Sequence, residues 1–196
     1  MSRVLFIRHG RTAWNAGGRI QGHTDIALDN VGRSDLDGRR LPREFAQWPV
    51  FASPLVRAVE SARLLGLAAP RLDDRLREMS YGAWEGSTWD EIRARHGDRL
   101  AALERQGLDF RPDGGESPRE LRARLRDWLG EIAGGVPVVA VTHKGVIRMA
   151  LAMATGWDLV SRAPHRLRWD RAHLFDVRQD PPGLCISRLN LPLEGG

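Results

Sequence analysis

Residues 4–12 read VLFIRHGRT, an apolar run of four residues that leads directly into Arg8, His9 and Gly10. A short apolar run that ends at such a boundary is typical of a strand buried on both faces, as in a parallel sheet. In open α/β sheets the ligand crevice lies outside the carboxyl ends of the strands. The stretch therefore predicts a buried strand that places an imidazole beside a guanidinium at the edge where ligands bind.

A second stretch repeats this arrangement. Residues 138–145 read VVAVTHKG, again an apolar run followed by a histidine, His143, and a glycine. A single histidine at the end of a strand is more often a structural hydrogen-bonding residue, but two in matched contexts favour a functional pair. If the two strands are parallel in one sheet, the imidazoles of His9 and His143 lie close together.

The remaining pattern alternates strands with helices. A short apolar run at 50–52 precedes an expected helix with Ser53 as its cap and Pro54 in its first turn. Further helices are expected from Ser117, as a cap, to about residue 129, and over 146–154. Runs at 172–177 and 184–189, separated by a Pro-Pro-Gly turn at 181–183, predict a hairpin at the sheet edge.

This alternation predicts an α/β fold. We expect a three-layer sandwich: a mostly parallel central sheet with helices on both faces, an antiparallel edge strand, and a helical or loop lid over the carboxyl ends of the strands. The length of 196 residues suits one domain spanning 1–196. The region from about 73 to 115, which is dense in charge, glycine and tryptophan, is expected to be a lid-like insertion.

The charge pattern argues against a nucleic-acid partner. The chain has 30 Lys and Arg against 25 Asp and Glu, a net charge of +5, and acidic residues interrupt the basic ones. Its one cysteine, Cys185, can form no internal disulfide, which favours a reducing compartment. No apolar stretch is long enough for a signal or membrane segment. We therefore expect a cytoplasmic protein that binds neither nucleic acid nor membranes.

A possible anion site follows the second expected strand. Residues 53–62 read SPLVRAVESA and place Arg57 in the first turn of the expected helix. The helix dipole disfavours a cation there, whereas a bound phosphate could accept hydrogen bonds from both Arg57 and the free backbone amides. The alternative is an exposed arginine paired with Glu60.

Two carboxylates stand among glycines and aromatic residues at 76–86, LREMSYGAWEG. A carboxylic acid near a bound phosphate could protonate a leaving oxygen, and a histidine could attack the phosphorus. Glu78 and Glu85 are both candidates for the acid, and either could instead cap a turn or pair with Arg77. The chemistry of the residues does not choose between them.

Together these segments resemble the histidine phosphatase superfamily, in its phosphoglycerate-mutase-like branch. The resemblance covers nearly the whole chain in the right order. Its motifs are RHGRT at 8–12 with WN at 14–15, SPL at 53–55 with RA and ESA following, Glu78 with WEG at 84–86, GGES at 114–117 and THKGVIR at 142–148.

The resemblance implies a role for each site residue. His9 corresponds to the nucleophile that becomes a phosphohistidine, and Glu78 to the proton donor. Arg8, Arg57 and His143 correspond to the residues that hold the phosphoryl group. Further phosphate-binding positions are Asn15, Gln21 and Gly22.

The implied activity is metal-independent hydrolysis of a small-molecule phosphomonoester. A phosphoglycerate mutase is the alternative, but the segment from Glu78 to His143 is short for a mutase of this family, which favours a phosphatase. A third hypothesis is a protein that binds a phosphorylated ligand without catalysis.

No cofactor and no metal are expected, because the six histidines show no zinc-ligand spacing. Lys144, the only lysine, stands where the family usually has a small residue. It could add phosphate affinity, contact a second anionic group of the substrate, or face solvent. The sequence does not determine the oligomeric state, and a homodimer is compatible with it.

Overall fold

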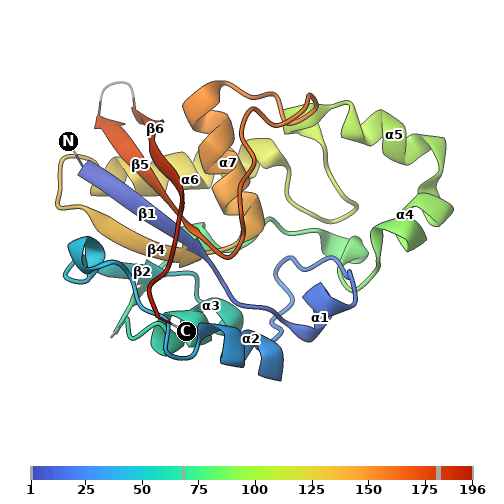
Figure 1. Cartoon of the computed structure of the whole chain (residues 1–196). Coiled ribbons are helices and arrows are strands. Elements are labelled where there is room, and N and C mark those ends of the chain that lie inside the picture. Colours follow the sequence, from blue (N-terminus) through green and yellow to red (C-terminus); the bar gives the residue numbers. More distant parts are fainter. Residues whose placement is uncertain (1, 68, 180–181, 196) are drawn as a thin grey trace.

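The computed structural model describes residues 2–67, 69–179 and 182–195. Its strands form one sheet in the order β3-β2-β4-β1-β5-β6 (Figure 1). They are β1 (Ser2–Arg8), β2 (Val50–Ala52), β3 (Arg71–Leu72), β4 (Val138–Thr142), β5 (Ala172–Gln179) and β6 (Pro182–Leu191). The first four pair in parallel, whereas β5 is antiparallel to both β1 and β6. The predicted α/β fold with a mostly parallel sheet is confirmed.

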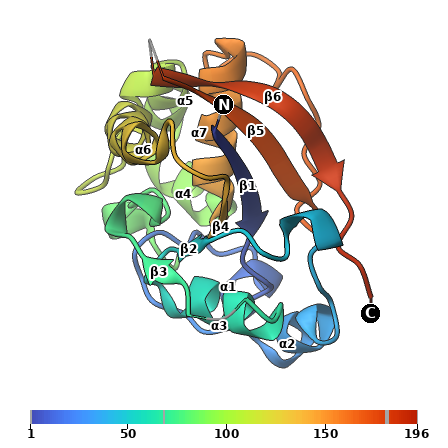
Figure 2. The same ribbon diagram turned by 90° about the vertical axis from the view of Figure 1, so that its left-hand side faces the viewer.

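Helices cover both faces of this sheet (Figure 2). Side chains alternate along a strand, so Val4 and Phe6 of β1 pack against α6 (Pro118–Ile132) and α7 (Lys144–Thr155). Leu5 and Ile7 pack on the opposite face against α2 (Asn30–Leu36) and α3 (Val56–Leu64). The continuous apolar run of β1 is thus explained by burial on both sides.

The start of α6 follows from its sequence. Ser117 and Glu120 form a reciprocal capping box, and Pro118 occupies the first turn. The helix presents Trp128 to the sheet, with ring-centroid distances of 6.1 Å to Phe6 and 5.6 Å to Phe51. Trp128 is fully buried, and its truncation to alanine is expected to cost about 3–5 kcal/mol of stability.

Two expected helix starts need correction. The helix after β2 begins at Val56 with Leu55 as its cap residue, so Ser53 does not cap it. The Ser53 hydroxyl instead contacts the His143 ring. Helix α7 begins at Lys144, two residues earlier than expected. Of the predicted turn at 181–183, Pro181 lies outside the described residues, whereas Pro182 and Gly183 already belong to β6 and pair with Gln179 and Arg178.

The region from about 73 to 115 contains α4 (Trp89–His96) and α5 (Asp98–Glu104), which lie apart from the sheet (Figure 1). Its Trp84, Ile92 and Leu100 form a small apolar cluster with Ile20, which follows α1 (Ala13–Ala16). The lid and single-domain assignments stay predictions. Within the described ranges, no helix is long and apolar enough to cross a membrane.

Candidate active site

The two strand-end histidines meet, as the sequence predicted. Strands β1 and β4 are parallel neighbours with Arg8 opposite Thr142, and the His9 amide donates to the Thr142 carbonyl at 2.9 Å. The ring centroids of His9 and His143 lie 5.0 Å apart. The register of the sheet therefore fixes both imidazoles at one place.

His9 has a defined tautomer. Its Nδ1 lies 2.7 Å from the Gly10 carbonyl oxygen, which can only accept, so Nδ1 carries the proton and Nε2 keeps its lone pair. Burial, together with the charges of Arg8 and Arg57, holds the pKa of His9 well below its usual value. The Gly10 amide is itself anchored by the Ser61 hydroxyl at 2.8 Å. His9 is therefore neutral at physiological pH and has an unprotonated ring nitrogen.

His143 has the opposite tautomer. Arg57 Nε donates to its Nδ1 at 3.3 Å, so the proton of neutral His143 is on Nε2, 2.8 Å from the Ser53 hydroxyl oxygen. Burial lowers the pKa of His143 well below its usual value, and the charge of Arg57 acts in the same direction. Ser53 is thus a site residue whose role the sequence did not predict.

Arg57 is fully buried and holds the loop that contains Gly22. Its Nη2 donates to the Gly22 carbonyl at 2.7 Å and its Nη1 to the Thr24 carbonyl at 2.9 Å. The predicted alternative of an exposed arginine paired with Glu60 is therefore wrong. Glu60 instead pairs with Arg33.

Arg8 has unused hydrogen-bonding capacity. Its Nε is buried, and no acceptor for it exists in the part of the chain that the structure describes. A buried, unsatisfied guanidinium donor is costly unless a ligand completes its bonding. Arg8 and His9 line the same cleft, so an anion bound there would satisfy Arg8 next to the His9 ring.

Asn15 and Gln21 line the same cleft. Asn15 Oδ1 accepts from the Thr12 amide at 3.1 Å, and Gln21 Nε2 donates to the Thr12 hydroxyl at 2.6 Å. Thr12 thus orients both predicted phosphate-binding side chains. The predicted site residues line this cleft except for Gly22 and His143, which lie behind it in contact with Arg57, and the roles of all of them stay predictions.

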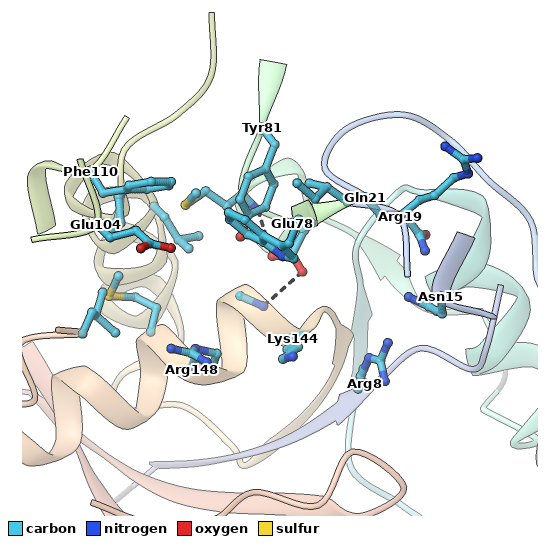
Figure 3. Close-up of a pocket in the computed structure, with 18 of the residues that line it drawn as sticks. Arg8, Asn15, Arg19, Gln21, Glu78, Tyr81, Glu104, Phe110, Lys144 and Arg148 are labelled. Carbon is cyan, nitrogen blue, oxygen red and sulfur yellow. Dashed lines mark hydrogen bonds between the residues drawn. The ribbon is translucent and has the colours of Figure 1, made fainter. Parts of the chain in front are cut away.

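Glu78 faces the cleft close to the start of α7 (Figure 3). Its two carboxyl oxygens accept from the Met79 amide at 2.9 Å and the Gly145 amide at 3.0 Å. Burial raises the pKa of Glu78, while these two hydrogen bonds oppose the shift. Glu78 therefore holds a proton to higher pH than an ordinary glutamate.

Glu85 has a different position. It accepts hydrogen bonds from the backbone amides of His23 at 3.0 Å, Thr24 at 2.7 Å and Tyr81 at 3.0 Å. Burial raises the pKa of Glu85, but these hydrogen bonds, with one from the Thr24 hydroxyl, outweigh it and leave the pKa low. Glu85 is thus an ionised clamp between two loops, whereas Glu78 faces the cleft.

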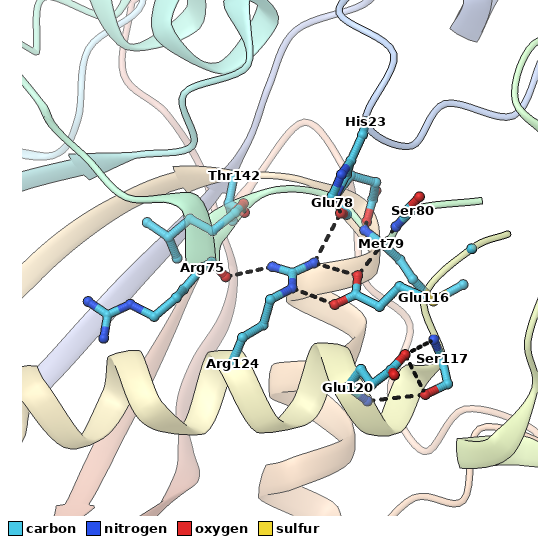
Figure 4. A network of polar contacts seen from close by, with 12 residues as sticks. His23, Arg75, Glu78, Met79, Ser80, Glu116, Ser117, Glu120, Arg124 and Thr142 are labelled. Atoms are coloured by element: carbon cyan, nitrogen blue, oxygen red, sulfur yellow. Dashed lines mark hydrogen bonds and ion pairs between the residues drawn. The ribbon is translucent and has the colours of Figure 1, made fainter. Parts of the chain in front are cut away.

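The sequence missed an ion pair that supports Glu78 (Figure 4). Arg124 of α6 bonds both carboxyl oxygens of Glu116, at 2.7 and 2.9 Å. The same guanidinium donates to the carbonyls of Glu78 at 3.0 Å and Arg75 at 2.6 Å. Glu116 also accepts from the Ser80 amide at 3.3 Å. The pair fixes the backbone on both sides of the Glu78 side chain.

The cleft has a volume of about 1100 Å³, far larger than a phosphoryl group needs. Its lining extends from Arg8 past Glu78 to Glu104, Phe110 and Arg148 (Figure 3). Among the described residues, no three His, Cys, Asp or Glu side chains are arranged to hold a metal ion. The residues that line the cleft supply imidazole, guanidinium and carboxyl groups.

Comparisons with known proteins agree with this geometry. Residues 4–192 match the family model "Histidine phosphatase superfamily (branch 1)". The chain is 36% identical to a glucosyl-3-phosphoglycerate phosphatase of Mycobacterium tuberculosis (strain CDC 1551 / Oshkosh), over 74% of this chain and 71% of that protein. It is 32% identical to a 2,3-bisphosphoglycerate-dependent phosphoglycerate mutase 2 of Gloeobacter violaceus, over 77% and 74%.

A solved structure of the mycobacterial glucosyl-3-phosphoglycerate phosphatase in complex with VO3 superposes with a TM-score of 0.78 at 25% identity, covering 97% of this chain and all of that one. Relatives of this chain thus include both phosphatases and mutases. From its sequence, its fold and the meeting of its two strand-end histidines, this chain belongs to the histidine phosphatase superfamily.

Proposed function

We propose that this chain hydrolyses small-molecule phosphomonoesters through a phosphohistidine on His9, with Glu78 as general acid and base and without a metal ion. One observation carries the proposal: the neutral His9 ring keeps its proton on Nδ1, bonded to the Gly10 carbonyl, and so has an unprotonated Nε2, while the neighbouring buried Nε of Arg8 has no hydrogen-bond partner among the described residues. Such a nitrogen can attack phosphorus, and such a donor binds the oxygens around it.

In the first step the Nε2 lone pair of His9 forms a bond to phosphorus as the ester P–O bond breaks. Glu78 in its acid form gives its proton to the departing oxygen, which leaves as an alcohol. The raised pKa of Glu78 supports this role, because the acid must still hold its proton near neutral pH. The Gly10 carbonyl continues to accept from Nδ1 and stabilises the positive charge that the ring gains.

In the second step a water attacks the phosphohistidine, and ionised Glu78 accepts its proton. The P–N bond breaks, its electrons return to Nε2, and inorganic phosphate leaves. Arg8, Arg57 and His143 would stabilise the charge on the phosphoryl oxygens in both steps. A bound dianion also favours a proton on Nδ1 of His143, which would convert that nitrogen from an acceptor for Arg57 to a donor.

Transfer of the phosphoryl group to a second substrate is the competing outcome, and the mutase relative supports it. We favour water as the acceptor because the segment between Glu78 and His143 is short for a mutase of this family. The two outcomes separate when 3-phosphoglycerate is supplied with its bisphosphate primer. A phosphatase releases inorganic phosphate, whereas a mutase accumulates 2-phosphoglycerate.

The test of the main proposal is hydrolysis of p-nitrophenyl phosphate in excess EDTA, followed by a screen of natural phosphomonoesters. His9→Ala should abolish turnover and the acid-labile label from a phosphorylated substrate. His165→Ala, which removes an exposed histidine outside the cleft, is the matched control and should retain both. Loss of wild-type activity on chelation would contradict metal independence. A screen in which no phosphomonoester is hydrolysed would favour a noncatalytic binding protein.

A further inference from the structure

The two cations of the first turns of α7, Lys144 and Arg148, are not used by the chemistry above. Both line the cleft. They are four residues apart, so they lie on the same face of the helix and repel each other. Burial and the charges of Arg148 and Arg8 lower the pKa of Lys144, with Glu78 opposing this shift. The arrangement therefore concentrates positive charge on one side of the cleft.

Neither cation forms an ion pair with a carboxylate of the described residues. Across residues 2–67, 69–179 and 182–195, every ion pair within 4.0 Å leaves out both of them. Their partners are aromatic faces instead: Lys144 Nζ lies 5.3 Å from the Trp169 ring centroid and the Arg148 guanidinium 4.9 Å from that of Trp157. These contacts hold the cations in place without cancelling their charge.

Their position relates them to the leaving group rather than to the phosphoryl group. Figure 3 shows Arg148, Lys144 and Arg8 in a row along one side of the cleft, with Glu78 opposite Lys144. Glu78 protonates the leaving oxygen in the proposed mechanism, and its carboxyl group is bonded to the Gly145 amide, next to Lys144. A substrate with its phosphoryl group at Arg8 and its leaving oxygen at Glu78 therefore extends towards Arg148.

We infer that Lys144 and Arg148 form a second anion site, so that the preferred substrate is a phosphomonoester whose alcohol part carries another negative group, a carboxylate or a second phosphate. This inference rests on the proposed function for the direction of the leaving group. The volume of about 1100 Å³ accommodates such a substrate. Glu104 and Phe110 on the far wall would contact the remainder of the alcohol.

The test compares substrates that differ in one charged group. For the carboxylate, 3-phosphoglycerate is compared with glycerol 3-phosphate, and for the phosphate, fructose 1,6-bisphosphate with fructose 6-phosphate. The readout is the ratio of two kcat/KM values in each pair, that of the substrate with the additional anionic group divided by that of the substrate without it. Lys144→Met and Arg148→Met should each lower this ratio roughly tenfold or more in at least one pair, since each removes a charge-assisted hydrogen bond. The pair that responds identifies the anion.

The control variant is Arg126→Met, which removes an exposed arginine of α6 outside the cleft and should leave the ratio as in wild type. An equal loss on both members of each pair would mean that Lys144 and Arg148 serve the phosphoryl group, and no change would mean that they face solvent. Either result overturns the inference.

A binding measurement separates this inference from the proposed function. Calorimetric titration of His9→Ala with 3-phosphoglycerate, glycerol 3-phosphate and the two fructose phosphates needs no turnover. Within a pair, the compound with the additional anionic group should bind more tightly than the other, and adding Lys144→Met and Arg148→Met should remove this difference in affinity. That result supports the second anion site even if the wild type hydrolyses nothing. Equal affinity within both pairs refutes the site even if hydrolysis is observed.

Discussion

Replacing Gly145 with alanine would displace Glu78 without removing it. A Cβ atom at residue 145 would lie 2.1 Å from Glu78 Oε1, well inside van der Waals contact. The carboxyl group has little room to move, because only 8% of Glu78 is exposed and its two oxygens bond the Met79 and Gly145 amides. The substitution therefore forces Glu78 out of its position while leaving its chemistry intact.

The expected magnitude follows from the interactions lost. A hydrogen bond to a charged group contributes about 1.5–3 kcal/mol, and a general acid contributes roughly 10²- to 10⁴-fold to the rate. We therefore expect Gly145→Ala to lower kcat for an alkyl phosphate by roughly 10²- to 10⁴-fold. The gain in helix propensity from glycine to alanine, about 1 kcal/mol at most, is offset by the overlap with Glu78.

Gly130→Ala is the matched control, because residue 130 lies in α6 with nothing within 4 Å of an added Cβ. It should raise the free energy of unfolding by up to about 1 kcal/mol and leave kcat unchanged. Steady-state kinetics and urea unfolding of both variants make the comparison. A folded Gly145→Ala enzyme with kcat within about twofold of wild type would refute the assignment of Glu78 as the acid.

Three further predictions concern Glu78, its support and the buried histidines. Glu78→Gln should slow the hydrolysis of an alkyl phosphate roughly 10²- to 10⁴-fold. It should slow the hydrolysis of p-nitrophenyl phosphate much less, because p-nitrophenolate leaves without a proton. Equal losses of rate on the two substrates would count against the role of Glu78 as the acid. Arg124→Met removes a positive charge that lowers the pKa of Glu78, so the alkaline limb of the kcat–pH profile should move to higher pH. Arg126→Met is the control and should leave the limb in place. If Arg124→Met also leaves the limb in place, Arg124 has only a structural role. Stability measured by urea unfolding should fall as pH drops below about 6.5, by up to about 1.4 kcal/mol per pH unit for each histidine, since the unfolded chain takes up protons that the folded state refuses at His9, His143 and His173. Glu78, whose folded pKa is raised, acts in the opposite direction, because it takes up a proton in the folded state at a pH above the ordinary glutamate pKa. A stability that does not change between pH 7 and about 5 would contradict the prediction.

The parts of the fold that the sequence predicted are those where local pattern and burial agree. The run before His9 is apolar at consecutive positions because β1 packs on both faces, and the same holds for β4 before His143. Parallel pairing then brings the two rings together without any further information. The capped start of α6 at Ser117 was also readable, because a capping box needs only residues that are three apart.

The failed expectation at Ser53 has a specific cause. Serine before proline is a common helix start, so local preference favoured a cap there. In the structure the Ser53 hydroxyl contacts His143 Nε2 at 2.8 Å, a contact between residues 90 positions apart. A neutral His143 needs an acceptor for the proton on that nitrogen, and this long-range demand outweighed the local preference for a cap.

The choice between Glu78 and Glu85 shows what residue chemistry alone lacks. Both are glutamates in the same glycine-rich stretch, and both accept backbone hydrogen bonds. Glu85 accepts enough of them, together with the Thr24 hydroxyl, to stay ionised, whereas Glu78 accepts two and is more deeply buried, so its pKa moves in the opposite direction. Arg124 and Glu116 do not produce this difference, since the charge of Arg124 lowers the pKa of Glu78, but they fix the backbone around Glu78 through contacts across 46 and 36 residues. With many arginines in the chain, nothing local distinguishes Arg124, so the acid is selected by tertiary contacts that only the folded chain contains.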